Sequence, residues 1–256
     1  MPLTLKISQG TIDIPIEKYK GIALAVSGGI DSATLLYIMS EYIHENNLNT
    51  QIYALTVPNK TDSASGYHAQ LVIEFVKRKF PVYINHTIKS TIFDGGNKNA
   101  VIEKWVKELL LADKIQCEMN GVTANPKDPS FKFVQPKNPY VKPLIAREGK
   151  PKKYKRIGEL DLHFPFANID KQGISEITEL KNITTKLLLI TKSCTSPVYY
   201  HCGECWWCQE RTWGFDIKYQ QIQNRQEKTL PKTTQQKLHE KKMKLTKPTK
   251  DNILKI

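Results

Sequence analysis

Two groups of residues in this chain have the types and spacing to do chemistry. The first is the turn Ser27-Gly28-Gly29-Ile30-Asp31-Ser32, whose glycines let the backbone approach a phosphate and whose hydroxyls add hydrogen-bond donors. The second is a set of four cysteines within fifteen residues, Cys194, Cys202, Cys205 and Cys208. Thiols at such spacing typically bind a metal ion. The sequence therefore predicts an anion site and a metal site.

The elements around the turn support the first prediction. Residues 22–26 are all apolar, which is typical of a strand buried on both faces in a parallel sheet. Apolar residues over 32–45 recur with helical spacing, so the turn joins a strand to a helix N-terminus. The unpaired N–H groups and the dipole of that terminus favour an anion. The alternative is that Asp31 or Ser32 merely caps the helix. The turn matches neither the Walker pattern nor the dinucleotide fingerprint.

The cysteine cluster favours a structural zinc ion. Cys202, Cys205 and Cys208 bring three sulfurs around one centre, and Cys194 completes a tetrahedron. An iron–sulfur cluster and a redox pair are the alternatives. Four sulfur ligands leave no open position, so the ion would have no catalytic role. Cys117 stands apart, and we interpret it as a small buried hydrophobic residue.

Alternating strands and helices predict an α/β fold. A Rossmann-like, mostly parallel sheet with helices on both faces follows from this order, plus a small C-terminal zinc-binding helical module. The expected strands lie at 22–26, 51–57, 81–88 and 115–122, and the expected helices at 32–45, 64–79, 99–112 and 171–181. In such sheets, ligands bind at the carboxyl ends of the strands. Residues 187–190 fit either a short strand or a helix end.

The chain divides into three parts. We expect a nucleotide-binding α/β domain over 1–190, a four-cysteine module over 191–228 and a basic tail over 229–256. Within the first part, 123–159 is rich in proline and lysine and lacks periodicity, which predicts a long loop or insertion.

Charge and hydropathy limit which partners and which cellular location we expect. The net charge is +13, and residues 216–256 carry eleven basic against four acidic side chains. A second basic run covers 150–156. One hypothesis is that these basic segments contact tRNA or DNA; the other is that their side chains are simply exposed to solvent. With no long apolar run and no secretory signal, we expect a cytoplasmic protein with no membrane span. A homodimer is compatible with the sequence.

The two motifs together resemble known families. Ser27-Gly28-Gly29-Ile30-Asp31-Ser32 after a hydrophobic strand resembles the SGGxDS loop of the PP-loop ATP pyrophosphatases. Ser193-Cys194 followed by 202–215 resembles the C-terminal end of the 7-cyano-7-deazaguanine synthases, and 166–174 resembles the segment in which a lysine precedes a helix. The resemblance implies that residues 27–32 hold the pyrophosphate of ATP, that Asp31 lies near Mg²⁺, and that Lys171 assists catalysis.

The resemblance also implies a reaction. The enzyme would adenylate 7-carboxy-7-deazaguanine and use ammonia to form the nitrile, releasing AMP and pyrophosphate, in queuosine or deazapurine modification of nucleic acid. Segments 57–62 and 120–126 depart from the family pattern where the substrate should be bound. Two alternatives therefore stay open. One is a PP-loop enzyme that adenylates a base in tRNA for thiolation or amidation, and the other is a non-catalytic zinc-ribbon nucleic-acid-binding protein.

Overall fold

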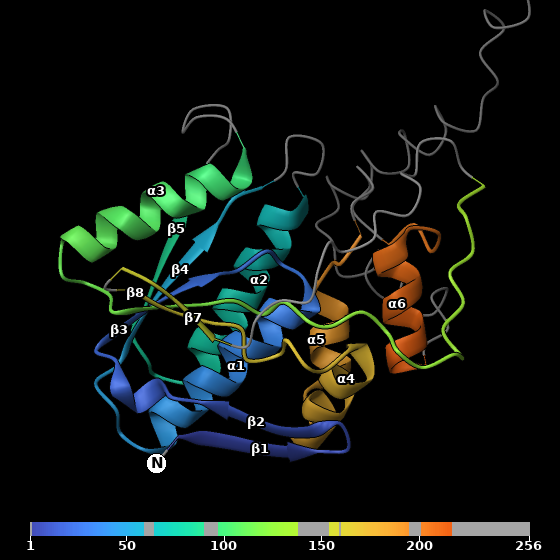
Figure 1. Cartoon of the computed structure of the whole chain (residues 1–256), viewed down its shortest axis with the longest axis horizontal. Helices are drawn as coiled ribbons and strands as arrows, with labels where there is room; N and C mark the ends of the chain where they lie inside the picture. Colours follow the sequence, from blue (N-terminus) through green and yellow to red (C-terminus); the bar gives the residue numbers. More distant parts are fainter. Residues whose placement is uncertain are drawn as a thin grey trace, which may run out of the picture.

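A computed structural model describes residues 2–58, 64–89, 97–137, 154–158, 160–194 and 201–216. Its centre is a six-stranded sheet with the order β5-β4-β3-β6-β8-β7 (Figure 1). The strands of this sheet are β3 (Gly21–Ala25), β4 (Gln51–Thr56), β5 (Ile84–Ile88), β6 (Cys117–Met119), β7 (Tyr154–Ile157) and β8 (Leu160–His163). All neighbouring pairs are parallel except β7 with β8.

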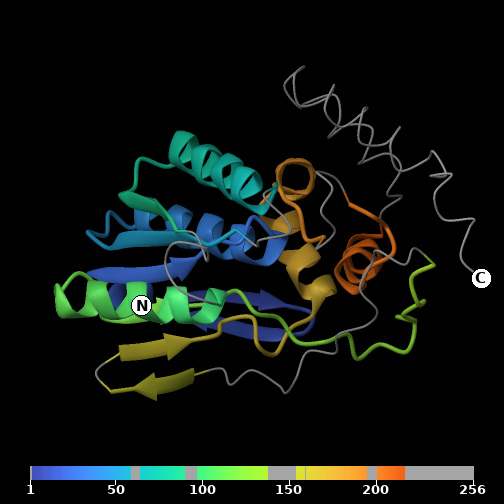
Figure 2. The ribbon, with the colours of Figure 1, turned by 90° about the horizontal axis from the view of Figure 1, so that it is seen from above.

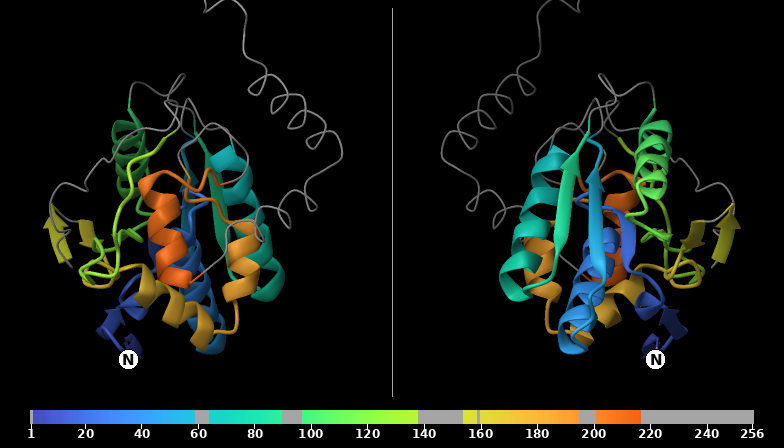
Figure 3. Two further views of the ribbon diagram at one scale, coloured as in Figure 1. Left: turned by 90° about the vertical axis from the view of Figure 1, so that its right-hand side faces the viewer. Right: turned by 90° about the vertical axis from the view of Figure 1, so that its left-hand side faces the viewer.

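Helices cover both faces of the sheet, and the two faces are clearly separated in Figure 3. On one face lie α1 (Ile30–Glu45), α2 (Ala64–Lys79), α4 (Lys171–Leu180) and α5 (Thr184–Ile190), which enclose the larger core. On the other face α3 (Lys98–Leu111) packs Val101, Trp105 and Val106 against Ala23 and Leu55. The fold is therefore a Rossmann-like α/β fold, as the alternating pattern predicted.

The chain order creates a switch point beside β3. From β3 the chain moves outward through β4 to β5, and then returns to place β6 on the opposite side of β3. Successive crossovers leave on opposite sides at this point, which opens a crevice beyond the carboxyl ends of β3 and β6. The turn after β3 lies at this crevice, because the strand ends at Ala25 and α1 begins at Ile30.

Most predicted elements are confirmed, with shifts of a few residues at their ends. Residues 187–190, left as strand or helix end, belong to α5. Two expectations need correction. The strand expected over 115–122 is confined to β6, and the long loop expected over 123–159 includes β7. Strand β8, which we did not predict, is parallel to β6 and antiparallel to β7, so the sheet extends further on this side. A three-residue strand and a late edge hairpin give too little periodicity to be recognised.

The N-terminal residues form a separate hairpin, β1 (Leu3–Ile7) with β2 (Gly10–Ile14), followed by the 3-10 helix η1 (Ile16–Lys18). The hairpin lies against α4, as Figures 1 and 2 show. Glu176 on α4 accepts hydrogen bonds from the Ser8 backbone N–H at 2.9 and 3.0 Å. Gln9 exchanges two hydrogen bonds with Asp170, at 2.7 and 3.0 Å, so the hairpin tip holds the start of α4. No helix among the described residues is long and apolar enough to cross a membrane.

The start of β3 allows a test of this packing. A Cβ atom at Gly21 would lie 1.8 Å from the carbonyl oxygen of Lys114, which is backbone and has little freedom to move. We expect Gly21→Ala to lower the free energy of unfolding by about 2 kcal/mol or more, measured by urea denaturation. Gly66→Ala is the control, because its Cβ would meet only the Pro58 side chain at 3.1 Å. Equal losses in the two variants would contradict the close approach at Gly21.

Candidate nucleotide and metal sites

The turn after β3 depends on its first glycine. Gly28 has a φ of +77°, a left-handed conformation that residues with a side chain rarely adopt. A Cβ at this position would also lie 2.5 Å from the carbonyl oxygen of Ser65 on α2. Both constraints require glycine, and together they bring the backbone of the turn against α2. Gly29 then takes the N-cap position of α1 without a side-chain cap.

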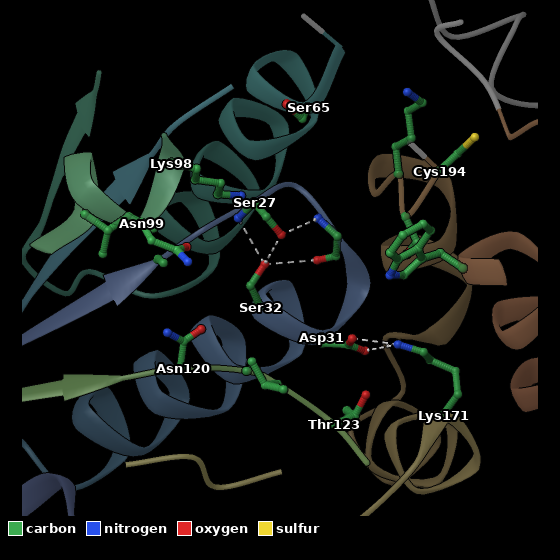
Figure 4. A pocket seen from close by; sticks show the side chains of 18 residues that line it. Ser27, Asp31, Ser32, Ser65, Lys98, Asn99, Asn120, Thr123, Lys171 and Cys194 are labelled. Atoms are coloured by element: carbon green, nitrogen blue, oxygen red, sulfur yellow. Dashed lines mark hydrogen bonds and ion pairs between the residues drawn. The ribbon is translucent and has the colours of Figure 1, made fainter. Parts of the chain in front are cut away.

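Two serines brace the turn from within. The Ser32 hydroxyl accepts from the Ser27 backbone N–H at 3.2 Å and donates to the Gly29 carbonyl at 3.2 Å. The Ser27 hydroxyl lies 3.3 Å from that of Ser32 and accepts from the Gly29 N–H at 3.3 Å. These contacts are drawn in Figure 4. Ile30 takes part through its backbone alone, since its side chain is fully buried in the core.

A cavity of about 480 Å³ opens in front of the turn, at the switch point of the sheet. Its walls come from the turn, the starts of α2, α3 and α4, the segment after β6, and the segment between α5 and the cysteines (Figure 4). Side chains with hydroxyl, carboxamide, carboxylate or ammonium groups line much of it: Ser27, Asp31, Ser32, Ser65, Lys98, Asn99, Asn120, Thr123, Lys171, Lys192 and Ser193. The position and the polar lining are typical of an anionic ligand site.

A buried ion pair lies at the floor of the cavity. Lys171 is 2% exposed, and its Nζ lies 2.5 and 2.6 Å from the two carboxylate oxygens of Asp31. A second carboxylate, that of the fully buried Glu210, lies 3.7 Å from the same Nζ. The sequence predicted that Asp31 and Lys171 act at one site, and the structure brings them into contact although 140 positions separate them.

The four predicted metal ligands also come together. The sulfur atoms of Cys194, Cys202, Cys205 and Cys208 all lie within 4.8 Å of one another and can hold a metal ion. The Sγ separations are 3.8 Å for Cys202 with Cys208 and 3.9 Å for Cys194 with Cys205. The Cys205 N–H donates to Cys202 Sγ at 3.3 Å, where the chain enters α6 (Trp206–Phe215). His201 is not part of this set of ligand atoms; its Nδ1 contacts Cys208 Sγ at 3.6 Å.

One short segment joins the cysteine cluster to the glycine turn. The backbone N–H of Lys192 donates to the Gly28 carbonyl at 2.8 Å, only two residues before Cys194. On the other side, the buried Arg211 of α6 donates to the Ser193 hydroxyl at 3.3 Å and to the Leu188 carbonyl at 2.9 Å. A metal ion at the cysteines would therefore fix the backbone that supports the turn.

Several lining residues were not predicted. Lys98, Asn99 and Ile102 come from α3, and Trp207 lies within the cysteine motif. Asn120 and Val122, which follow β6, belong to segment 120–126, where the resemblance placed the substrate. In the sequence, Lys98 follows Gly95-Gly96-Asn97, shortly after the strand expected at 81–88, which is the one signal that could have drawn attention to it. The basic tail at 229–256 and the whole basic run at 150–156 lie outside the residues whose side chains the structure describes.

The sequence matches no protein-family model and no curated protein at a significant level. Two solved structures show a loose likeness. A U34-tRNA thiolase from Methanococcus maripaludis, solved with its [4Fe-4S] cluster, is 14% identical, covers 90% of this chain and 72% of its own, and has a TM-score of 0.43. An NAD⁺ synthetase from Burkholderia pseudomallei is 12% identical, covers 89% of this chain and 82% of its own, and has a TM-score of 0.40.

The buried ion pair makes a prediction about stability. Replacing Lys171 by methionine leaves Asp31 and Glu210 without their shared cation, so the free energy of unfolding should fall by about 3 kcal/mol. Lys181→Met is the matched control, because Lys181 pairs with Glu41 at 2.5 Å but is more exposed. That variant should lose less than about 1 kcal/mol. Urea denaturation of both measures the difference, and similar losses would refute the role of Lys171.

The cysteine cluster makes a prediction about metal content. Each change of Cys194, Cys202, Cys205 or Cys208 to serine should remove the bound metal and lower the unfolding temperature, because three thiolates hold an ion far less well than four. Cys117→Ala is the control, since Cys117 is fully buried in the core, away from the cluster. Elemental analysis of the purified proteins measures the metal. Full metal content in any of the four serine variants would exclude that residue as a ligand.

Proposed function

We propose that this chain is a PP-loop ATP pyrophosphatase that cleaves ATP between the α- and β-phosphates and transfers AMP to a carboxylate. The observation that carries the proposal is the turn at residues 27–32, which presents the N-terminus of α1 to a polar cavity at the switch point of the sheet. Free N–H groups at this terminus suit a leaving pyrophosphate.

The residues of the turn have distinct roles in this proposal. Gly28 and Gly29 let the backbone contact the pyrophosphate, and the hydroxyls of Ser27 and Ser32 brace the turn. Asp31 would hold Mg²⁺ together with the phosphates of ATP, because Mg²⁺ commonly binds one or two carboxylates plus substrate phosphates. Bound Mg²⁺ would neutralise part of the negative charge of the phosphates. Lys171 positions Asp31 and adds positive charge to the floor of the cavity.

The substrate that we propose is 7-carboxy-7-deazaguanine. Its carboxylate oxygen attacks the α-phosphorus, the bond to the bridging oxygen breaks, and pyrophosphate leaves with the electron pair. Ammonia then attacks the carbonyl carbon, the C–O bond to AMP breaks, and the nitrogen loses a proton to give the amide. Adenylation of the amide oxygen by a second ATP, followed by loss of AMP and both N–H protons, gives the nitrile 7-cyano-7-deazaguanine.

We propose zinc as the metal at the four cysteines. A regular tetrahedron with metal–sulfur bonds of ~2.3 Å has edges of about 3.8 Å. The sulfur separations of 3.8 and 3.9 Å fit that geometry around a single ion. An iron–sulfur cluster attaches its cysteines to different iron atoms and so needs wider spacing. With four protein ligands the zinc would be structural, holding α6 and the segment at residues 192–194 beside the cavity.

Among the alternatives, thiolation of a tRNA base finds less support. It would need a further reactive cysteine to carry sulfur, and Cys117 is the remaining one in the chain. Cys117 is fully buried, and burial raises the pKa of its thiol, so the nucleophilic thiolate is disfavoured.

The decisive experiment supplies ATP, Mg²⁺, ammonium and 7-carboxy-7-deazaguanine to the purified chain. We expect AMP, pyrophosphate and the nitrile, detected by chromatography and mass spectrometry. Asp31→Asn should reduce the rate at least about 100-fold, since it removes the carboxylate from the floor of the cavity. Lys181→Met, just beyond the C-terminal end of α4, should retain the rate.

Other outcomes would contradict the proposal in different ways. ADP and phosphate in place of AMP and pyrophosphate would exclude cleavage between the α- and β-phosphates. AMP formed only when tRNA is added would favour base adenylation in tRNA. No AMP under any of these conditions, with nucleic-acid binding that weakens steeply with salt, would favour the zinc-ribbon alternative.

A further inference from the structure

The cavity in front of the turn has apolar as well as polar walls. Asp31, Lys171 and the serines already described make up only part of its lining. Much of the remaining lining comes from α3, the segment after β6 and the start of α6, and it combines the apolar side chains Ile102, Val122 and Trp207 with polar ones. Figure 4 shows Lys98 and Asn99 on one side of the cavity, and Cys194 and Lys171 on the opposite side. With a volume of about 480 Å³, the cavity has room for more than a pyrophosphate, and this remaining lining has no role in the proposal above.

Lys98 is the cation that α3 contributes to the cavity lining. Its side chain is partly buried at the cavity wall, and no carboxylate among the described residues pairs with it. Desolvation lowers the pKa of Lys98, which reflects an ammonium group without a compensating partner. By contrast, Lys89, also partly buried, pairs with Glu108 at 3.4 Å. A partly desolvated cation at a cavity is stabilised when an anionic ligand binds beside it.

Trp207 supplies an aromatic surface. Its ring packs against the cysteine cluster on one side and lines the cavity on the other. Because Trp207 lies between Cys205 and Cys208 in the chain, a metal at the cluster would hold the indole in place. The indole N–H of Trp207 makes no hydrogen bond with another described residue, so it is available as a donor to a ligand. A fixed indole with a free donor suits a planar ligand that carries an acceptor.

We propose that Lys98 and Trp207 form the acceptor subsite and select a planar aromatic carboxylate. Lys98 holds the carboxylate facing the α-phosphate, and the ring of the acceptor stacks on Trp207. Ile102 and Val122 complete the apolar wall, while the carboxamides of Asn99 and Asn120 offer donors and acceptors to the edge of the ring. This inference rests on the proposed function, since it assigns the acceptor of the same reaction.

The experiment measures binding separately from catalysis. Isothermal titration would follow two carboxylates, 7-carboxy-7-deazaguanine and indole-3-carboxylate, in wild type, Lys98→Met and Trp207→Leu. We expect each substitution to weaken binding of both carboxylates about 10-fold or more, through loss of a charge-assisted hydrogen bond or of stacking. Affinity for ATP with Mg²⁺ should change less than about 3-fold, because neither residue holds the phosphates. Lys104→Met is the matched control, as an exposed lysine on the same helix.

The probes themselves separate the two contributions. Indole-3-carboxamide, which lacks the charge, should bind weakly to wild type and be insensitive to Lys98→Met. Cyclohexanecarboxylate, which lacks the planar ring, should be insensitive to Trp207→Leu. Thermal unfolding and metal analysis check that each variant is folded, and Trp207→Phe should restore part of the affinity.

Failure of this inference and failure of the proposed function give different results. Equal weakening of ATP and carboxylate binding in Lys98→Met would make Lys98 a phosphate ligand and overturn the assignment. Carboxylate binding that neither substitution changes would overturn it as well, even if AMP and pyrophosphate are formed. Specific carboxylate binding lost in both variants, with no AMP formed by wild type, would support the subsite and refute the reaction.

Discussion

The buried ammonium group of Lys171 is the constraint on which the site depends. A cation that is 2% exposed is stable only beside carboxylates, and the two that it contacts come from α1 and α6. The ion pair therefore fixes three helices relative to one another. Gly214 on α6 makes this approach possible, because a Cβ there would lie 2.5 Å from the Cβ of Lys171. The charge at the floor of the cavity is thus set by helix packing rather than by the turn alone.

Helix α6 brings together features that lie far apart in the sequence. It carries Glu210, which contacts the ion pair, Trp207, which lines the cavity, Arg211, which supports the segment beside the turn, and Cys208 of the cluster. The cysteine cluster and the cavity are consequently parts of one arrangement, with Cys194 lining the cavity itself. An ion held by all four thiolates would act on the proposed reaction only through the placement of side chains, because it would have no open position for a substrate.

The sequence predicted the parts of the structure that rest on local patterns. Helices with clear periodicity, the turn at residues 27–32 and the cysteine spacing were all located from residue types. The hairpin of β7 with β8 was not, because four-residue strands at the edge of a sheet carry little pattern. The cavity lining from α3 and α6 was missed for a different reason. Lys98 and Trp207 are unremarkable in their own segments, and their placement at one cavity depends on the switch point and on the position of α6.

The N-terminal hairpin has a practical consequence for anyone shortening this chain. Gln9 hydrogen-bonds to Asp170, and Ser8 hydrogen-bonds to Glu176. Residues that precede the central sheet therefore support the N-cap of α4 and, with it, the backbone of Lys171. A fragment that begins at β3 would keep the glycine turn and the four cysteines but lose the hydrogen bonds that hold the start of α4. Boundaries chosen from the sequence motifs alone would therefore remove part of what positions Lys171 in the site.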